Sequence, residues 1–150
     1  MEITTLCYIE KDNKYLMLHR NKRKKDINGG KWIGLGGHCL EGEDPDSCIV
    51  REVEEESGLK IIDYKLCGKI TFVIDDLEEI CYLYKVDSFS GELIECDEGD
   101  LHWVEKKKVL DLNLWEGDHL FLEKLINNDN YFEMKLNYEN GNLISHKIKE

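Results

Sequence analysis

The sequence has no run of about 20 apolar residues, the length that a helix needs to cross a lipid bilayer. Its first segment, Met1–Asp12, has no basic flank, no long apolar stretch and no small-residue cleavage site, so it does not resemble a secretory signal. Repeats, low-complexity tracts and linker-like segments are also absent, and Pro45 is the single proline. We therefore predict one domain spanning residues 1–150, no membrane partner and a cytoplasmic location.

Positive charge is scarce, because 20 Lys and Arg residues stand against 32 Asp and Glu residues and give a net charge of -12 at pH 7. Proteins that bind long nucleic acids rely on clustered Lys and Arg side chains, so this charge argues against such a partner. We expect any contact with phosphate groups to go through a metal ion.

The six cysteines show no C-x-x-C spacing, the pattern that is common in zinc sites and redox-active pairs. In a chain without a secretory signal, free thiols are favoured over disulfides. Cys39 and its neighbour His38 have no recognisable metal-binding partners in the sequence, so we expect neither to bind a metal ion.

Strand-forming segments are intermixed with two helical patterns. The predicted strands are Ile3–Ile9, Tyr15–Leu18, Lys31–Gly37, Leu66–Ile74, Ile80–Val86, Leu101–Val104, Tyr131–Tyr138 and Leu143–Ile148. The predicted helices are Pro45–Ser57 and Trp115–Ile126. This mixture favours an α/β (α+β) fold in which helices cover a mixed β-sheet.

The first helix has clear start and stop signals. Asp44 is a good N-cap, Pro45 suits the first helical position, and Gly58 can adopt the left-handed conformation that ends a helix. If Glu52 is placed at zero, Glu55 and Glu56 lie about 60° to one side and about 40° to the other, at 100° per residue. The three carboxylates therefore share one edge of the helix.

Crowding of like charges costs an isolated helix about 0.2–0.5 kcal/mol per pair. A hard divalent cation would offset that cost, because magnesium prefers oxygen ligands and often shares carboxylates with substrate phosphates. The alternative is a solvated surface in which the glutamates pair in part with Arg51.

A longer motif favours the metal site. Residues 37–59 read GHCLEGEDPDSCIVREVEEESGL and resemble the 23-residue signature of the Nudix hydrolases at every specified position. Those positions are Gly37, five residues, Glu43, seven residues, Arg51-Glu52, an aliphatic residue, any residue, Glu55-Glu56, any residue, Gly58 and an aliphatic residue. The resemblance implies a Nudix-type α/β/α sandwich and hydrolysis of a nucleoside diphosphate linked to another group.

The resemblance also implies the roles of particular residues in this segment, called the Nudix box below. By position, the metal ligands are Glu52, Glu55, Glu56 and the backbone carbonyl of Gly36. The implied cofactor is Mg²⁺, with Mn²⁺ as a substitute. Structural roles fall to Gly37, Gly58 and the supporting ion pair between Glu43 and Arg51.

Family members often place a proton acceptor in a loop before a late strand. Glu98, three residues before Leu101, matches that position, and Glu52 is the alternative. Glu98 can equally be read as an ordinary loop acid. The candidate catalytic residues are therefore Glu52, Glu55, Glu98 and Arg51.

The order of elements outside the box is similar to that of the MutT-type branch, which hydrolyses oxidised purine nucleoside triphosphates. That resemblance implies that Trp115 stacks on the base and that Asp118 reads the purine edge, whereas the plainer interpretation buries Trp115 in the core. Gly117 and Ile33 depart from residues found in close relatives, so base selectivity stays open. Arg20 is a candidate for steering the triphosphate, unless it belongs to an ordinary solvated loop.

These features lead to one main hypothesis and two alternatives. The main hypothesis is a pyrophosphohydrolase that converts a nucleoside triphosphate, such as the oxidised purine nucleotide 8-oxo-dGTP, into a nucleoside monophosphate and pyrophosphate. The alternatives are a Nudix hydrolase of ADP-ribose, a dinucleotide or a nucleotide sugar, and a module that senses a nucleotide without turnover. A monomer and a homodimer are both compatible with the sequence.

Overall fold

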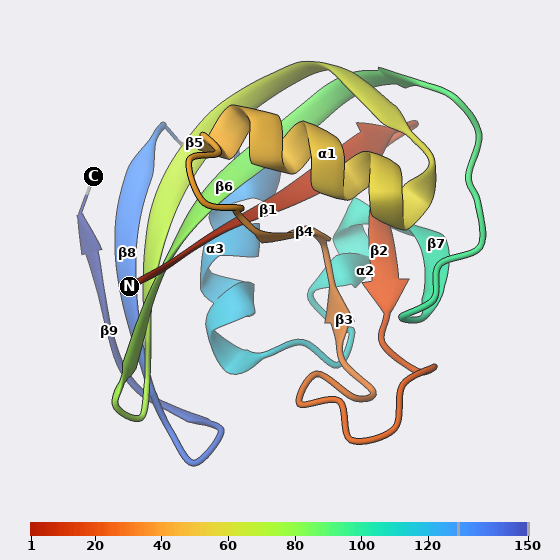
Figure 1. The fold of residues 1–150 in the computed structure, drawn as a ribbon. Coiled ribbons are helices and arrows are strands. Elements are labelled where there is room, and N and C mark those ends of the chain that lie inside the picture. The colour runs from red at the N-terminus through yellow and green to blue at the C-terminus, as the bar shows by residue number, and fades with distance from the viewer. Residues whose placement is uncertain (129, 150) are drawn as a thin grey trace.

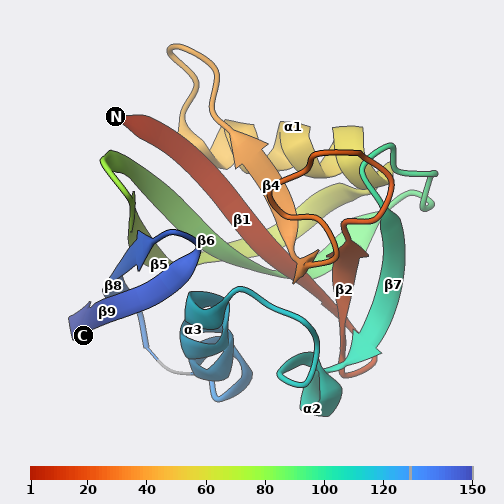
Figure 2. The same ribbon diagram turned by 90° about the horizontal axis from the view of Figure 1, so that it is seen from below.

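The computed structural model describes residues 1–128 and 130–149. A mixed β-sheet lies between helices, with α1 (Pro45–Ser57) on one face and α2 (Lys106–Val109) and α3 (Glu116–Ile126) on the other (Figures 1 and 2). The strands are β1 (Glu2–Lys11), β2 (Lys14–His19), β3 (Trp32–Ile33), β4 (Leu35–His38), β5 (Lys60–Ile74), β6 (Leu77–Ser90), β7 (Asp100–Glu105), β8 (Phe132–Glu139) and β9 (Asn142–Lys149). The predicted mixed sheet covered by helices is confirmed.

The sheet combines parallel and antiparallel pairs. Its main order is β3-β2-β1-β6-β5-β8-β9, while β4 pairs with β1 and β7 pairs with β2. The pairs β1–β6 and β5–β8 are parallel, and the others are antiparallel. The central strand β1 therefore pairs with β4, which leads into α1. It also pairs with β6, which connects it to β5, β8 and β9.

Alternation along the central strands separates the core into two layers. Tyr8 of β1 packs towards α3 together with Phe121, whereas Cys7 and Ile9 pack towards α1 together with Ile49. Successive side chains of a strand point to opposite faces, so one strand serves both layers. The sheet thereby fixes α1 and α3 relative to each other.

Several predicted elements differ from the structure. β5 begins at Lys60 instead of Leu66, because Ile61 is buried against the α1 layer. α3 begins at Glu116, with Trp115 as an extended N-cap residue. The short helix α2 was not predicted, because a stretch rich in lysine carries no clear helical pattern.

No helix within residues 1–128 and 130–149 is both long enough and apolar enough to cross a membrane. All six cysteines are free thiols, and Cys7, Cys48, Cys81 and Cys96 are buried.

Candidate active site

Local capping sets both ends of α1. Asp44 has extended backbone angles, and its carboxylate accepts a hydrogen bond of 2.8 Å from the Ser47 amide, which satisfies a free donor of the first turn. Gly58 ends the helix with a φ of 80°, a conformation that L side chains rarely adopt. Buried Ile49 and Val53 anchor the helix on the sheet and leave the glutamates at its edge.

Arg51 is the centre of an ion-pair network. Its Nε and Nη2 atoms donate to the two carboxylate oxygens of Glu43 at 2.8 and 2.9 Å, a bidentate arrangement. Its Nη1 atom donates to Glu52 at 2.8 Å and to Glu55 at 3.1 Å. The hydrogen bonds from Arg51 lower the pKa of Glu43 to about 2. The guanidinium thus joins the loop before α1 to two of the helix carboxylates.

The Glu56 carboxylate is the most deeply placed of the three. It accepts a 2.9 Å hydrogen bond from the Gly36 amide. Burial raises the pKa of Glu56 well above its usual range, and the nearby negative charges of Glu98 and Glu52 raise it further. Burial likewise raises the pKa of Glu52. Either protons or a cation must therefore neutralise part of this cluster.

Two glycines make room for this cluster. A Cβ atom on Gly37 would lie 2.6 Å from Glu52 Cδ, so a side chain there would displace the carboxylate. Gly36 has a φ of 151°, and a Cβ atom there would lie 2.0 Å from the backbone oxygen of Thr5. The carboxylates of Glu52, Glu55 and Glu56 form what is called the acidic edge of α1 below. The strand β4 can approach both β1 and this acidic edge only because Gly36 and Gly37 lack side chains.

Glu98 reaches the same cluster from the loop before β7. Arg20 Nη1 lies 3.3 Å from one oxygen of Glu98, and Arg23 Nη2 lies 3.6 Å from the other. Arg20 also pairs with Asp26 at 2.8 Å. Arg20 is therefore held between two carboxylates, and Arg23 is a second basic contact of Glu98.

A pocket of about 620 Å³ extends from the glycines of β4 to the start of α3. Gly36 and Gly37 line one end, and Trp115 and Asp118 line the other. Asp118 is 5% exposed, and burial raises its pKa to about 7. A carboxyl group with that pKa can donate or accept a hydrogen bond near neutral pH.

Trp115 is half-buried at this pocket and packs partly against the core. Its indole nitrogen donates to the Asn28 side chain at 2.6 Å, and its ring meets the Tyr138 ring edge-on at 6.1 Å. Tyr138 also accepts a hydrogen bond of 2.7 Å from the Gly117 amide. Trp115 is therefore both a partly buried residue that packs against the core and part of the pocket wall.

Sequence reasoning missed several residues that line the pocket, namely Ile27, Asn28, Phe72 and Tyr138. They come from a loop and from strands far apart in the chain, so no local spacing identifies them. Trp32 stacks on His19 at 4.4 Å and is not among the residues that line this pocket.

Comparison with known proteins places the chain in a family. The family model for the NUDIX domain matches residues 2–125. An uncharacterised Nudix hydrolase of Bacillus subtilis (strain 168) is 30% identical over 129 residues, which cover 82% of this chain and 78% of that protein. An oxidized purine nucleoside triphosphate hydrolase of Danio rerio is 24% identical, covering 99% of this chain and 95% of that protein.

The fold comparison agrees with the sequence comparison. A crystal structure described as a mutator MutT protein from Bacillus halodurans superposes with a TM-score of 0.91 at 25% identity, covering 99% of this chain and 98% of that one. The chain belongs to the Nudix family of hydrolases, whose members act on pyrophosphate bonds.

Proposed function

We propose that this protein hydrolyses a purine nucleoside triphosphate, with oxidised purines as the favoured class, to a nucleoside monophosphate and pyrophosphate. The observation that carries the proposal is the pocket that joins the Nudix box to Trp115 and Asp118. One end can face the phosphates beside the acidic edge of α1, and the other can hold an aromatic base. The similarity to the Danio rerio hydrolase over nearly the whole chain supports the same substrate class.

The residues of the acidic edge suit a hard divalent cation. Nudix hydrolases generally use divalent metal ions. Glu52, Glu55, Glu56 and the Gly36 carbonyl would hold Mg²⁺, or Mn²⁺ in its place, since these ions prefer oxygen ligands. When bound, the cation neutralises phosphate charge and makes a water molecule more acidic. Burial raises the pKa values of Glu52 and Glu56, and neighbouring carboxylates raise them further, so a bound cation would offset both effects.

A carboxylate must accept the proton of the attacking water. Glu98 is suited to this role because Arg20 and Arg23 fix it beside the acidic edge of α1. Glu52 is the alternative, held by Arg51 Nη1 at 2.8 Å. Arg51 positions Glu52 and Glu55 and does not need to touch the substrate in this arrangement.

Base recognition falls to the other end of the pocket. Trp115 presents an aromatic ring on which a purine can stack, worth about 1–3 kcal/mol in nucleic-acid sites. Asp118, with a pKa of about 7, offers either a donor or an acceptor to the edge of the base. A carboxyl group that can do both is suited to purines whose hydrogen-bonding edge is altered by oxidation.

A substrate panel tests the proposal. Purified protein with Mg²⁺ is incubated separately with 8-oxo-dGTP, dGTP, ADP-ribose, a dinucleotide and a nucleotide sugar, and the products are separated and quantified. The proposal predicts fastest turnover of an oxidised purine triphosphate with release of pyrophosphate. Faster turnover of ADP-ribose than of every triphosphate, or nucleotide binding without turnover, would contradict it.

A further inference from the structure

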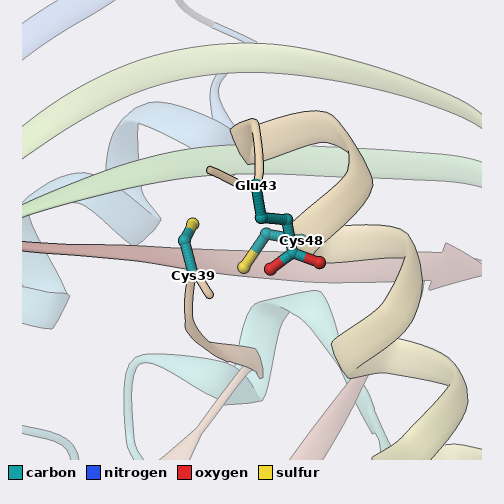
Figure 3. A group of neighbouring side chains, drawn as sticks. All are labelled: Cys39, Glu43 and Cys48. Carbon is teal, nitrogen blue, oxygen red and sulfur yellow. The ribbon is translucent and has the colours of Figure 1, made fainter. Parts of the chain in front are cut away.

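A second group of metal-ligating side chains lies at the start of the Nudix box. Cys39 and Glu43 come from the loop between β4 and α1, and Cys48 comes from the first turn of α1 (Figure 3). One ligand atom from each lies within 4.8 Å of the others, and among residues 1–128 and 130–149 this is the one group of His, Cys, Asp and Glu with that geometry.

The fold holds these residues together without any bound ion. The Cys39 amide donates to the Ile3 carbonyl of β1 at 2.9 Å. The Leu40 amide donates to the Glu43 carboxylate at 2.9 Å, and the Glu43 amide donates back to the Leu40 carbonyl at 3.0 Å. The thiol of buried Cys48 lies 3.4 Å from Thr5 Oγ1. Three hydrogen bonds donated by backbone amides, together with the burial of the Cys48 thiol, therefore hold the three residues in place.

The chemistry of the group differs from that of the acidic edge. Two thiols and one carboxylate form a ligand set that zinc accepts, whereas magnesium takes oxygen ligands. With Zn–S bonds of about 2.3 Å and Zn–O bonds of about 2.0–2.2 Å, neighbouring ligands of a tetrahedral ion lie about 3.5–3.8 Å apart. The ligand atoms of Cys39, Glu43 and Cys48 lie within 4.8 Å of one another, so ion binding would require side-chain rotations that bring them closer.

The local charge also suits a divalent ion. Two thiolates and Glu43 would carry three negative charges, and the guanidinium of Arg51, whose Nη2 lies 4.0 Å from Cys48 Sγ, is shared with Glu52 and Glu55 and offsets only part of them. A divalent cation would neutralise most of the remaining negative charge. Binding releases the two thiol protons to solvent, so the ion replaces them without any change of oxidation state.

We propose that Cys39, Glu43 and Cys48 form a binding site for a thiophilic divalent cation of the zinc class, with its fourth ligand supplied by water. The sequence alone indicated no partner for Cys39, and the turn from β4 into α1 supplies two. The site lies beside the acidic edge but shares none of the ligands assigned to magnesium.

The site is connected to the acidic edge through Arg51. Glu43 holds Arg51 through two hydrogen bonds, and Arg51 holds Glu52 and Glu55. A cation that draws an oxygen of Glu43 away leaves the guanidinium to bind Glu52 and Glu55 more tightly. This consequence rests on the proposed function: the thiophilic ion should then slow hydrolysis at saturating Mg²⁺.

The test uses cadmium as the probe, because its thiolate complexes have an ultraviolet charge-transfer band. The reduced full-length protein, with excess Mg²⁺ to occupy the acidic edge, is titrated with Cd²⁺ and then with competing Zn²⁺. We expect a band that saturates at one equivalent and is reversed by zinc. Cys39→Ser and Cys48→Ser should each weaken binding by at least about tenfold, a loss that even outer-shell partners of metal ligands produce.

Cys67→Ser is the matched control, because Cys67 is also a partly buried free thiol but lies on β5. It should bind cadmium like the unaltered protein. An absent band, or equal binding by Cys39→Ser, would overturn the proposal. Cys39 is only partly buried, so that variant remains informative if replacement of fully buried Cys48 prevents folding. The band needs no substrate, so its outcome is independent of whether the triphosphate activity is found.

Discussion

The acidic edge of α1 and the pocket around Trp115 are built in different ways. The acidic edge comes from one short segment, and an ion-pair network centred on Arg51 holds much of it near solvent. The pocket end comes from a loop, two strands and the start of α3, and its Asp118 carboxylate is buried. The proposed metal-binding edge therefore depends on local spacing, whereas the proposed base-binding end depends on tertiary packing.

The largest effect should follow from removal of one acidic ligand. Glu55→Gln keeps the shape of a side chain that is 60% exposed, so the fold should be unchanged. A bound metal contributes several kcal/mol of transition-state stabilisation, and loss of a ligand should lower kcat by about 1,000-fold. Steady-state kinetics measure the loss, and thermal unfolding checks the fold.

Glu54→Gln is the control for that substitution, since Glu54 is the adjacent exposed glutamate and points away from the edge formed by Glu52, Glu55 and Glu56. It should retain full activity. Equal activity of Glu55→Gln and Glu54→Gln would mean that the acidic edge does not hold the catalytic cation.

The next effect concerns the stability of the protein and involves Asp118, which is buried at the Trp115 end of the pocket. Burial raises the pKa of Asp118 from 3.8 to about 7. Its contribution to the free energy of unfolding is therefore fully present below pH 3.8 and is lost as pH rises through about 7. At about 1.4 kcal/mol per pKa unit, that contribution is at most about 4 kcal/mol. Asp118→Asn should therefore flatten the fall in unfolding free energy between about pH 4 and pH 7, as measured by urea unfolding.

Glu56 also has a raised pKa and is present in both proteins, so the difference between the two pH profiles isolates Asp118. Parallel profiles would show that the Asp118 carboxyl titrates as in the unfolded chain.

A smaller effect is expected from the aromatic wall of the pocket. Trp115→Ala removes the stacking surface, which should cost about 1–3 kcal/mol of substrate binding and appear mainly in KM. Trp103→Ala is a comparison, because Trp103 packs with Phe89 in the α1 layer at 5.8 Å. If Trp115→Ala and Trp103→Ala raised KM equally, Trp115 would be a core residue only.

The smallest effect separates two roles for Arg20. Arg20 pairs with Asp26 and Glu98, so Arg20→Gln should lower kcat a few-fold by loosening Glu98 and leave KM nearly unchanged. Measurement of kcat and KM across pH separates the roles. A selective rise in KM for the triphosphate would instead assign Arg20 to substrate binding, as the sequence suggested.

The same contrast explains what the sequence could predict. The predicted bounds of α1 agree with the structure, because Asp44, Pro45 and Gly58 act locally, and the spacing within the box predicted that its glutamates share one edge. The start of β5 was missed because burial of Ile61 depends on packing against α1. The approach of Cys39 to Cys48 was also invisible, since it depends on how β4 turns into α1.

One measurement addresses the central claim most directly: crystals containing Mn²⁺ and a non-hydrolysable 8-oxo-dGTP analogue, examined by anomalous diffraction. The account predicts an anomalous peak among the carboxylates of Glu52, Glu55 and Glu56, with the base against Trp115 and its edge bonded to Asp118. An acidic edge without a peak, in crystals where the analogue is bound elsewhere, would contradict it.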